Sequence, residues 1–131
     1  MDDMNDPQGR TPLHQAAVEG NVSLVRSLIE AGADVGAADK MGATALHFAC
    51  QQDHLEVATV LLEAGAPVDV RDAYGNTPLW RAVFAFQGGD PALIRALLAA
   101  GSDPDAQNES GRSPRDMALT FDRPGIRAVF G

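Results

Sequence analysis

The chain has 131 residues, of which 45% are hydrophobic, and this is enough apolar surface to bury a core in one compact unit or a short array. Its net charge of −8 disfavours nucleic acid as a partner, and its low aromatic content of 5% disfavours a β-sandwich. An acidic N-terminus without an apolar leader, apolar runs too short to span a membrane, and a single cysteine that cannot form an internal disulfide predict a soluble, cytoplasmic protein.

An internal repeat with a period of 33 residues runs along the chain. Gly9, Gly42 and Gly75 lie 33 residues apart, and two further positions keep that interval, namely Thr11, Thr44, Thr77, Leu13, Leu46 and Leu79. A fourth copy follows after 36 residues, and the three extra residues lie between Phe86 and Asp90. Such a period is typical of a solenoid, whose repeats stack on their neighbours. We therefore predict a single domain, 1–131, with repeats at about 6–38, 39–71, 72–107 and 108–131.

Each repeat is predicted to begin with a tight turn and a first helix. The turn starts at an aspartate that can accept bonds from backbone N–H groups, and it continues to a glycine that suits a left-handed backbone. A threonine then provides the N-cap of the helix, followed in two copies by a proline at the first helical position. Small residues one turn later let neighbouring helices approach closely. The aspartates are Asp6, Asp39 and Asp72, and the small pairs are Ala16–Ala17, Ala49–Cys50 and Ala82–Val83.

A second helix is predicted in each of the first three repeats. Apolar residues at i, i+1, i+4 and i+5 form one stripe on a helix. The stripes are Leu24, Val25, Leu28 and Ile29, then Val57, Ala58, Leu61 and Leu62, then Leu93, Ile94, Leu97 and Leu98. A glycine follows each stripe, as is usual at a helix C-terminus. We expect the stripes to be buried between neighbouring repeats, because one repeat cannot cover its own apolar face.

The fourth copy is predicted to cap the stack. It has Arg115 and Asp116 where the first copy has Leu13 and His14, so its outer surface is polar. Its second helix is predicted to be brief, within residues 125–130. A polar terminal repeat keeps the end of a solenoid soluble.

The openings of the first three copies, 6–17, 39–50 and 72–83, resemble the ankyrin repeat signature. This resemblance implies an all-α solenoid of about four helix–loop–helix repeats joined by β-hairpin-like turns, with a degenerate C-terminal cap. It also implies a protein-binding module whose concave face is formed by the hairpin tips and the first helices. Segments 77–84 and 113–118 are similar to small stand-alone bacterial ankyrin proteins, some of which are immunity proteins that neutralise a toxin.

The resemblance places the partner-binding residues at the turns and at the exposed ends of the first helices. The residues expected to bind a partner are Arg10, Lys40, Met41, Gln51, Gln52, Arg71, Tyr74, Asn76, Trp80, Arg81, Phe84, Phe86, Glu109 and Arg112. Neighbouring positions that share these surfaces are Pro7, Gln8, Val18, Glu19, Ala43, Ala73, Ala85 and Ser110.

The third repeat is the most distinctive part of this predicted surface. It holds the only tyrosine and the only tryptophan, and Trp80 replaces the histidine of the first two copies. Tryptophan, tyrosine and arginine are the residues most often found at interface hot spots. The alternative is that Trp80 and Phe84 only fill space against the cap. Alanine at Tyr74 and Arg81 is expected to weaken partner binding and to leave thermal stability nearly unchanged.

Catalytic and metal chemistry are not indicated by the sequence. His14 and His47 occupy equivalent positions about 10 Å apart in stacked helices, too far to share one zinc ion, and in ankyrin proteins this histidine commonly bonds neighbouring backbone. His47 and Cys50 form only a two-ligand fragment. Glycines and aspartates recur at the repeat spacing, which explains them as framework residues. We therefore expect neither an enzyme nor a cofactor or metal.

Two functions fit the sequence, an immunity protein that inhibits a cognate toxin and a general adaptor or regulatory scaffold. Basic residues fall at the turns, whereas Glu30, Glu56 and Glu63 fall on the second helices, so we expect a mixed or locally positive front and an acidic back. The charge of the partner surface is open, because many acidic residues belong to the framework. The free chain is expected to be monomeric, with a protein partner and without nucleic acid or membrane contacts.

Overall fold

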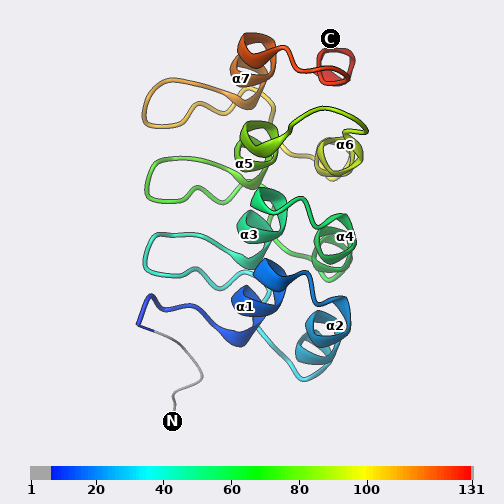
Figure 1. Cartoon of the computed structure of the whole chain (residues 1–131). Coiled ribbons are helices and arrows are strands. Elements are labelled where there is room, and N and C mark those ends of the chain that lie inside the picture. The colour runs from blue at the N-terminus through cyan, green and yellow to red at the C-terminus, as the bar shows by residue number, and fades with distance from the viewer. Residues whose placement is uncertain (1–6, 131) are drawn as a thin grey trace.

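The computed structural model describes residues 7–130, which form four stacked helical pairs. The pairs are α1 (Pro12–Glu19) with α2 (Val22–Glu30), α3 (Ala45–Gln51) with α4 (Leu55–Glu63), α5 (Pro78–Ala85) with α6 (Ala92–Ala99), and α7 (Pro114–Phe121) with α8 (Arg127–Phe130). In Figure 1, α1, α3, α5 and α7 form one row, α2, α4 and α6 form a second, and the hairpin loops project on the other side of the first row. The predicted all-α solenoid is confirmed. Asp6, the first predicted framework aspartate, lies outside the described residues.

The first helices begin where the sequence predicts. The hydroxyl oxygen of Thr11 accepts a hydrogen bond from the backbone N–H of His14, and the His14 ring accepts one in return from the Thr11 N–H. Thr44 and His47 repeat this reciprocal cap. In α5, Trp80 has no ring acceptor, so only the Thr77 half of the cap remains.

Histidine side chains connect successive repeats. Nε2 of His14 donates to the carbonyl of Ala43 at 2.9 Å, and Nε2 of His47 donates to the carbonyl of Asn76 at the same distance. Because the other ring nitrogen already accepts from the cap, both histidines are held by backbone, as the resemblance implies. Burial lowers the pKa of His47 to about 4, so this ring is neutral at pH 7.

The hairpins form their own ladder along the stack. The backbone N–H of Lys40 donates to the Gln8 carbonyl at 2.9 Å, that of Ala73 to Met41 at 2.8 Å, and that of Glu109 to Tyr74 at 2.9 Å. Figure 1 shows the hairpin loops that these bonds join, lying one above another along the stack. A ladder of this kind fixes the spacing of the tips, which carry many of the predicted binding residues.

Replacing the glycine of a turn is expected to destabilise the chain more where the next hairpin packs closely against that glycine. Gly75 has φ +79°, and an added Cβ would lie 2.9 Å from the backbone nitrogen of Glu109, whereas Gly111 has φ +76° and open space around it. Gly111→Ala is expected to lower the free energy of unfolding by about 1 kcal/mol through left-handed strain alone. Gly75→Ala adds the clash and is expected to lower it by about 2–3 kcal/mol. Urea denaturation of the two variants measures the difference, and equal losses would show that the hairpin ladder adds nothing.

The core follows the apolar stripes, with one correction. In the second and third repeats Val57, Leu61 and Leu93 are buried, as predicted. Leu24 was predicted to be buried with them, but it is 40% exposed. This prediction was wrong because α2 belongs to the first repeat, where no earlier helical pair among the described residues covers the stripe. Cys50 is buried among the small core residues, and burial raises the pKa of its thiol.

The longer third repeat supports the cap. The loop between α5 and α6 holds the extra residues, and a Cβ on Gly125 would lie 2.6 Å from the Gly89 carbonyl oxygen. The Arg123 guanidinium donates to the Phe86 carbonyl and, at 3.4 Å, to that of Phe84, so it satisfies the end of α5. The insertion therefore has a structural role in addition to any role in binding. Within residues 7–130, the helices are all too short, or too polar, to cross a membrane.

Candidate partner-binding surface

A groove of about 520 Å³ opens between the third hairpin and the ends of α3 and α5. We call it the aromatic groove, and its lining residues are Gln51, Asp72, Tyr74, Asn76, Trp80, Arg81, Phe84, Ala85 and Gln87. Six of the fourteen residues expected to bind a partner thus come together in one hollow. Asp72 and Gln87 were not expected to line this groove, the first because it was assigned to the framework. Gln87 follows Phe86 in the insertion, and that position was the signal available for it.

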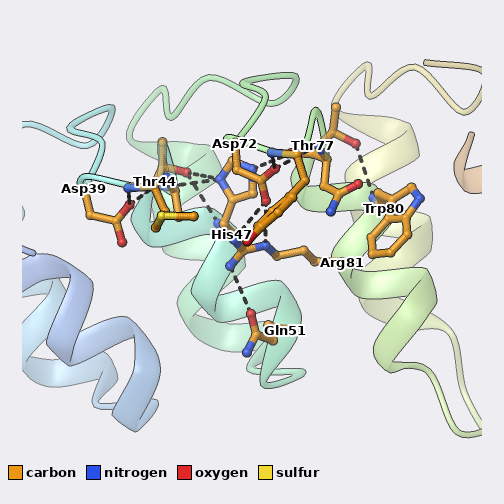
Figure 2. Close-up of polar contacts among 12 residues, drawn as sticks. Asp39, Thr44, His47, Gln51, Asp72, Thr77, Trp80 and Arg81 are labelled. Atoms are coloured by element: carbon orange, nitrogen blue, oxygen red, sulfur yellow. Dashed lines mark hydrogen bonds and ion pairs between the residues drawn. The ribbon is translucent and has the colours of Figure 1, made fainter. Parts of the chain in front are cut away.

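Arg81 is held rigidly across this groove. Its Nη2 lies 2.9 Å from Oδ2 of Asp72, and its Nη1 donates to Oε1 of Gln51 at 2.9 Å (Figure 2). The Asp72 carboxylate also accepts the backbone N–H groups of Tyr74 and Asn76, both at 2.9 Å. One aspartate therefore fixes the hairpin and the arginine together, and the pair leaves the middle of the groove without net charge.

Exposed aromatic rings form one wall of the groove. Trp80 and Phe84 stack with ring centroids 5.0 Å apart and an interplanar angle of 12°, and Phe84 also meets Phe121 of α7 at 5.8 Å. Phe84 is 52% exposed and Tyr74 is 62% exposed. Trp80 is half-buried, so it does fill space toward the cap. The alternative that Trp80 and Phe84 only fill space does not account for the exposed half of the Phe84 ring.

The Trp80 indole is polar and unsatisfied at its nitrogen. Among the residues that the structure describes, its buried Nε1 has no hydrogen-bond partner. His14 and His47, at the same position, donate to the next repeat instead. A buried donor without an acceptor costs about 1–3 kcal/mol. Trp80 therefore lacks the bond to the next repeat that His14 and His47 make, and its ring packs against Phe84 and the core instead.

Arg10 is a second arginine that lies over the row of first helices, on α3. Phe48, on α3, lies between Arg10 at 4.8 Å and Arg81 at 5.5 Å from its ring centroid. Phe48 was not among the expected binding residues, and its equivalence to Arg81 in the repeat alignment was the signal for it. Arg10 also lies 3.6 Å from Oδ2 of Asp39. These cation–π and ionic contacts fix the arginines over the inner helices.

The remaining expected residues lie outside the aromatic groove. Gln52 and Phe86 line a neighbouring hollow of about 260 Å³ beside the insertion. The exposed hairpin tips carry the others, which are Lys40, Met41, Arg71, Glu109 and Arg112. Ala43 was expected at an exposed turn position, but it is buried under the hairpin ladder. The surface formed by the second helices was expected to be acidic, but its charge is mixed, because Arg26 and Arg95 are exposed there as well.

Metal ligation has no support in the side-chain arrangement. Across residues 7–130, no group of three or more His, Cys, Asp or Glu side chains converges as metal ligands do. What the surface offers is aromatic area, a fixed guanidinium and amide groups, which suit recognition of another protein.

Comparisons with known proteins agree with the repeat pattern. The family model described as ankyrin repeats (3 copies) matches residues 1–72 and 36–108. The Notch-regulated ankyrin repeat-containing protein A of Danio rerio and the proteins of the corresponding name from Xenopus tropicalis and Homo sapiens are each 44% identical to this chain over 34 residues. That segment covers 26% of this chain, and the chain spans only about 30% of the length of these relatives. The family match covers most of the sequence, and the chain belongs to the ankyrin repeat family.

Proposed function

We propose that this chain binds a partner protein through the aromatic groove and the adjoining hairpin tips. Ankyrin repeats are protein-interaction modules, and the family supplies this general function. The observation that carries the assignment to the groove is Trp80, which replaces a stabilising histidine, leaves a buried N–H unpaired and stacks on the exposed ring of Phe84. Natural proteins depart from local packing and hydrogen-bonding rules mainly at functional sites, and the unpaired Trp80 N–H is such a departure.

The geometry of the groove suits a hot spot. Aromatic rings and arginine contribute most of the binding energy in protein interfaces, and they do so best when they are already held in place. Arg81 is fixed by Asp72 and Gln51, and Phe84 is fixed by the rings on either side of it. Little conformational entropy is therefore lost when a partner covers this surface.

Substitution of Trp80 by histidine separates binding from stability. Histidine is expected to restore the reciprocal cap with Thr77 and to donate a hydrogen bond to the fourth repeat. The new bond is expected to stabilise the chain by about 1 kcal/mol, which offsets the loss of the tryptophan ring contacts. The free energy of unfolding is expected to change by less than about 1 kcal/mol, while the affinity for the partner falls about tenfold or more. Differential scanning calorimetry and titration calorimetry with the captured partner measure the two effects.

The capture experiment needs a matched surface control. Immobilised wild-type chain, Phe84→Ala and Leu119→Ala are incubated with extract of the native host, and retained proteins are identified by mass spectrometry. Leu119 on α7 is 42% exposed and is not among the residues that line the groove. A partner retained by wild type and Leu119→Ala but lost with Phe84→Ala supports the proposal. Equal retention by all three removes the groove from the interface.

The inhibitory form of this proposal names the partner as a cognate toxin. It is supported by the similarity of residues 77–84 and 113–118 to small bacterial ankyrin proteins, and the adaptor or scaffold role is the alternative. Co-expression with a toxin-like neighbouring gene product distinguishes the two. Rescue of growth by wild type, and loss of rescue with Phe84→Ala, supports immunity, whereas equal killing with and without the chain leaves the adaptor role.

A further inference from the structure

A side chain before the second helix of one repeat can bond to the end of the first helix of the repeat before it. In the second repeat, Nε2 of His54 donates to the Val18 carbonyl at 3.1 Å. Arg123 holds the same place in the fourth repeat, since it and His54 each directly follow a non-glycine residue with positive φ that comes after the first helix. Arg123 donates at 3.4 Å to the carbonyl of Phe84, which stands at the position of Val18. The bond therefore recurs, and in the fourth repeat it holds a residue that lines the aromatic groove.

The arginine at this position makes more contacts than the histidine does. The Arg123 guanidinium also donates to the Phe86 carbonyl, so it binds two carbonyls at the end of α5. Its Cζ lies 4.7 Å from the centroid of the Phe121 ring, and that ring lies 5.8 Å from the ring of Phe84. A planar guanidinium can make these contacts together, because its N–H groups point outward in the plane while its face stacks on a ring. Arg123 therefore holds Phe84 through its carbonyl and, by way of Phe121, through its ring.

The loop between α5 and α6 packs closely against the segment that follows α7. A Cβ on Gly125 would lie 2.6 Å from the Gly89 carbonyl oxygen, and a Cβ on Gly88 would lie 3.7 Å from Cδ of Pro124. The first of these approaches leaves no room for a side chain, so the two backbones are in contact there. Gln87, in the same loop, lines the aromatic groove. The segment that carries the arginine is therefore docked directly beside the groove.

We propose that Arg123 is a positioning residue for the aromatic groove, because it docks the segment after α7 on the end of α5 and so holds the Phe84 ring against Trp80. This inference rests on the proposed function, in which those two rings form the wall that a partner covers. Without the guanidinium, Phe84 loses the bond to its carbonyl, and the Phe121 ring beside it loses its cation–π contact. A ring that must be ordered during binding contributes less to affinity, because part of the contact energy offsets the lost entropy.

Hydrogen exchange of the Trp80 indole tests this inference on the free chain. Trp80 is the only tryptophan, so its indole N–H gives a single signal in a proton–nitrogen correlation spectrum. Its Nε1 is buried and, within residues 7–130, has no hydrogen-bond partner, so exchange requires the surrounding groups to open rather than a bond to break. Arg123→Ala is expected to speed this exchange about tenfold or more relative to the backbone amides of α4, which lies in the second repeat.

Two further variants serve as controls. Arg123→Lys keeps the charge, but an ammonium group does not reproduce the flat stacking and the fork of donors, so an intermediate exchange rate is expected. Arg127 belongs to the same repeat and pairs with Asp122 at 2.9 Å, with both side chains more than half exposed. Because an exposed pair of this kind contributes little to stability, Arg127→Ala is expected to leave the exchange of the Trp80 indole unchanged.

Four results would overturn the inference. A wild-type indole that exchanges as fast as an exposed tryptophan would mean that the rings are not held. Equal acceleration of the indole and of the α4 amides by Arg123→Ala would mean a general loss of stability. Faster exchange of the α7 amides with an unchanged indole would mean that the fourth repeat docks without acting on the groove, and equal effects of Arg123→Ala and Arg127→Ala would remove any specific role of Arg123. These measurements need no partner, so they are separate from the capture experiment with Phe84→Ala, which tests the proposed function.

Discussion

Replacing Asp72 with alanine is expected to lower the free energy of unfolding by about 3–5 kcal/mol. The residue is only 7% exposed, and its two oxygens bind two backbone N–H groups and the Arg81 guanidinium. Alanine leaves both N–H donors and a largely buried cation without a partner, and uncompensated charge is the larger part of this loss. Urea denaturation followed by circular dichroism measures it.

Asp39 provides the matched control for this prediction. Its Oδ1 accepts the N–H groups of Met41 and Ala43 at 2.9 Å, which reproduces the hairpin part of the Asp72 contacts. Its arginine, Arg10, is 3.6 Å away and more exposed than Arg81. Asp39→Ala is therefore expected to lower the free energy of unfolding by about half as much as Asp72→Ala. Equal losses for the two variants would show that Arg81 contributes nothing to the stability of the fold.

The Asp72 contacts change one expectation drawn from the sequence. Alanine at Arg81 was expected to leave thermal stability nearly unchanged, as for an exposed hot-spot residue. Because Asp72 is buried and Arg81 is its partner, Arg81→Ala leaves a buried carboxylate unpaired and is expected to destabilise the chain. The expectation remains for Tyr74, whose ring is exposed. Binding tests of the groove are therefore interpretable with Tyr74→Ala or Phe84→Ala rather than with Arg81→Ala.

Features encoded locally were predictable from the sequence. Thr11, Thr44 and Thr77 start helices through bonds to residues three positions away, so their role can be read without a structure. The repeat period then supplied the stacking, and the departure from it at Trp80 marked the position that now shows the unpaired indole nitrogen.

Features that depend on which repeat lies next to a residue were not predictable in the same way. Leu24 carries the same pattern as Val57, but within residues 7–130 no helical pair precedes α2, and Leu24 is exposed there. The partner of Arg81 lies nine residues away and its second acceptor, Gln51, lies thirty residues away, so no local pattern joins them. The contact between Gly125 and Gly89 likewise depends on the length of the insertion and on the path of the cap.

Lowering the pH from 7 to 4 is expected to destabilise the chain through His47 by roughly 3 kcal/mol. The folded-state pKa of His47 is lowered from 6.5 to about 4, first by burial, with Arg81 adding to the effect, while the hydrogen bond to Asn76 and the carboxylates of Asp72 and Asp39 oppose it. Below pH 6.5 the unfolded chain binds a proton that the folded chain does not. Stability contributed by the neutral ring is therefore complete above pH 6.5, decreases as the pH falls, and is lost below about pH 4.

The contribution of His47 can be isolated with His47→Gln, because glutamine does not titrate and every other group titrates in both proteins. Denaturation midpoints at pH 7, 6, 5 and 4 are expected to fall more steeply for wild type, with an additional slope of up to about 1.4 kcal/mol per pH unit for one proton. At pH 7 the wild type is expected to be the more stable protein, since glutamine cannot reproduce both the cap with Thr44 and the bond to Asn76. Near pH 4 the free energies of unfolding of the two proteins are expected to converge. Protonation of the wild-type ring then begins, and a protonated ring cannot accept the hydrogen bond from the Thr44 N–H. Parallel pH profiles would mean that this histidine titrates normally in the folded chain and that its two backbone bonds do not hold it neutral.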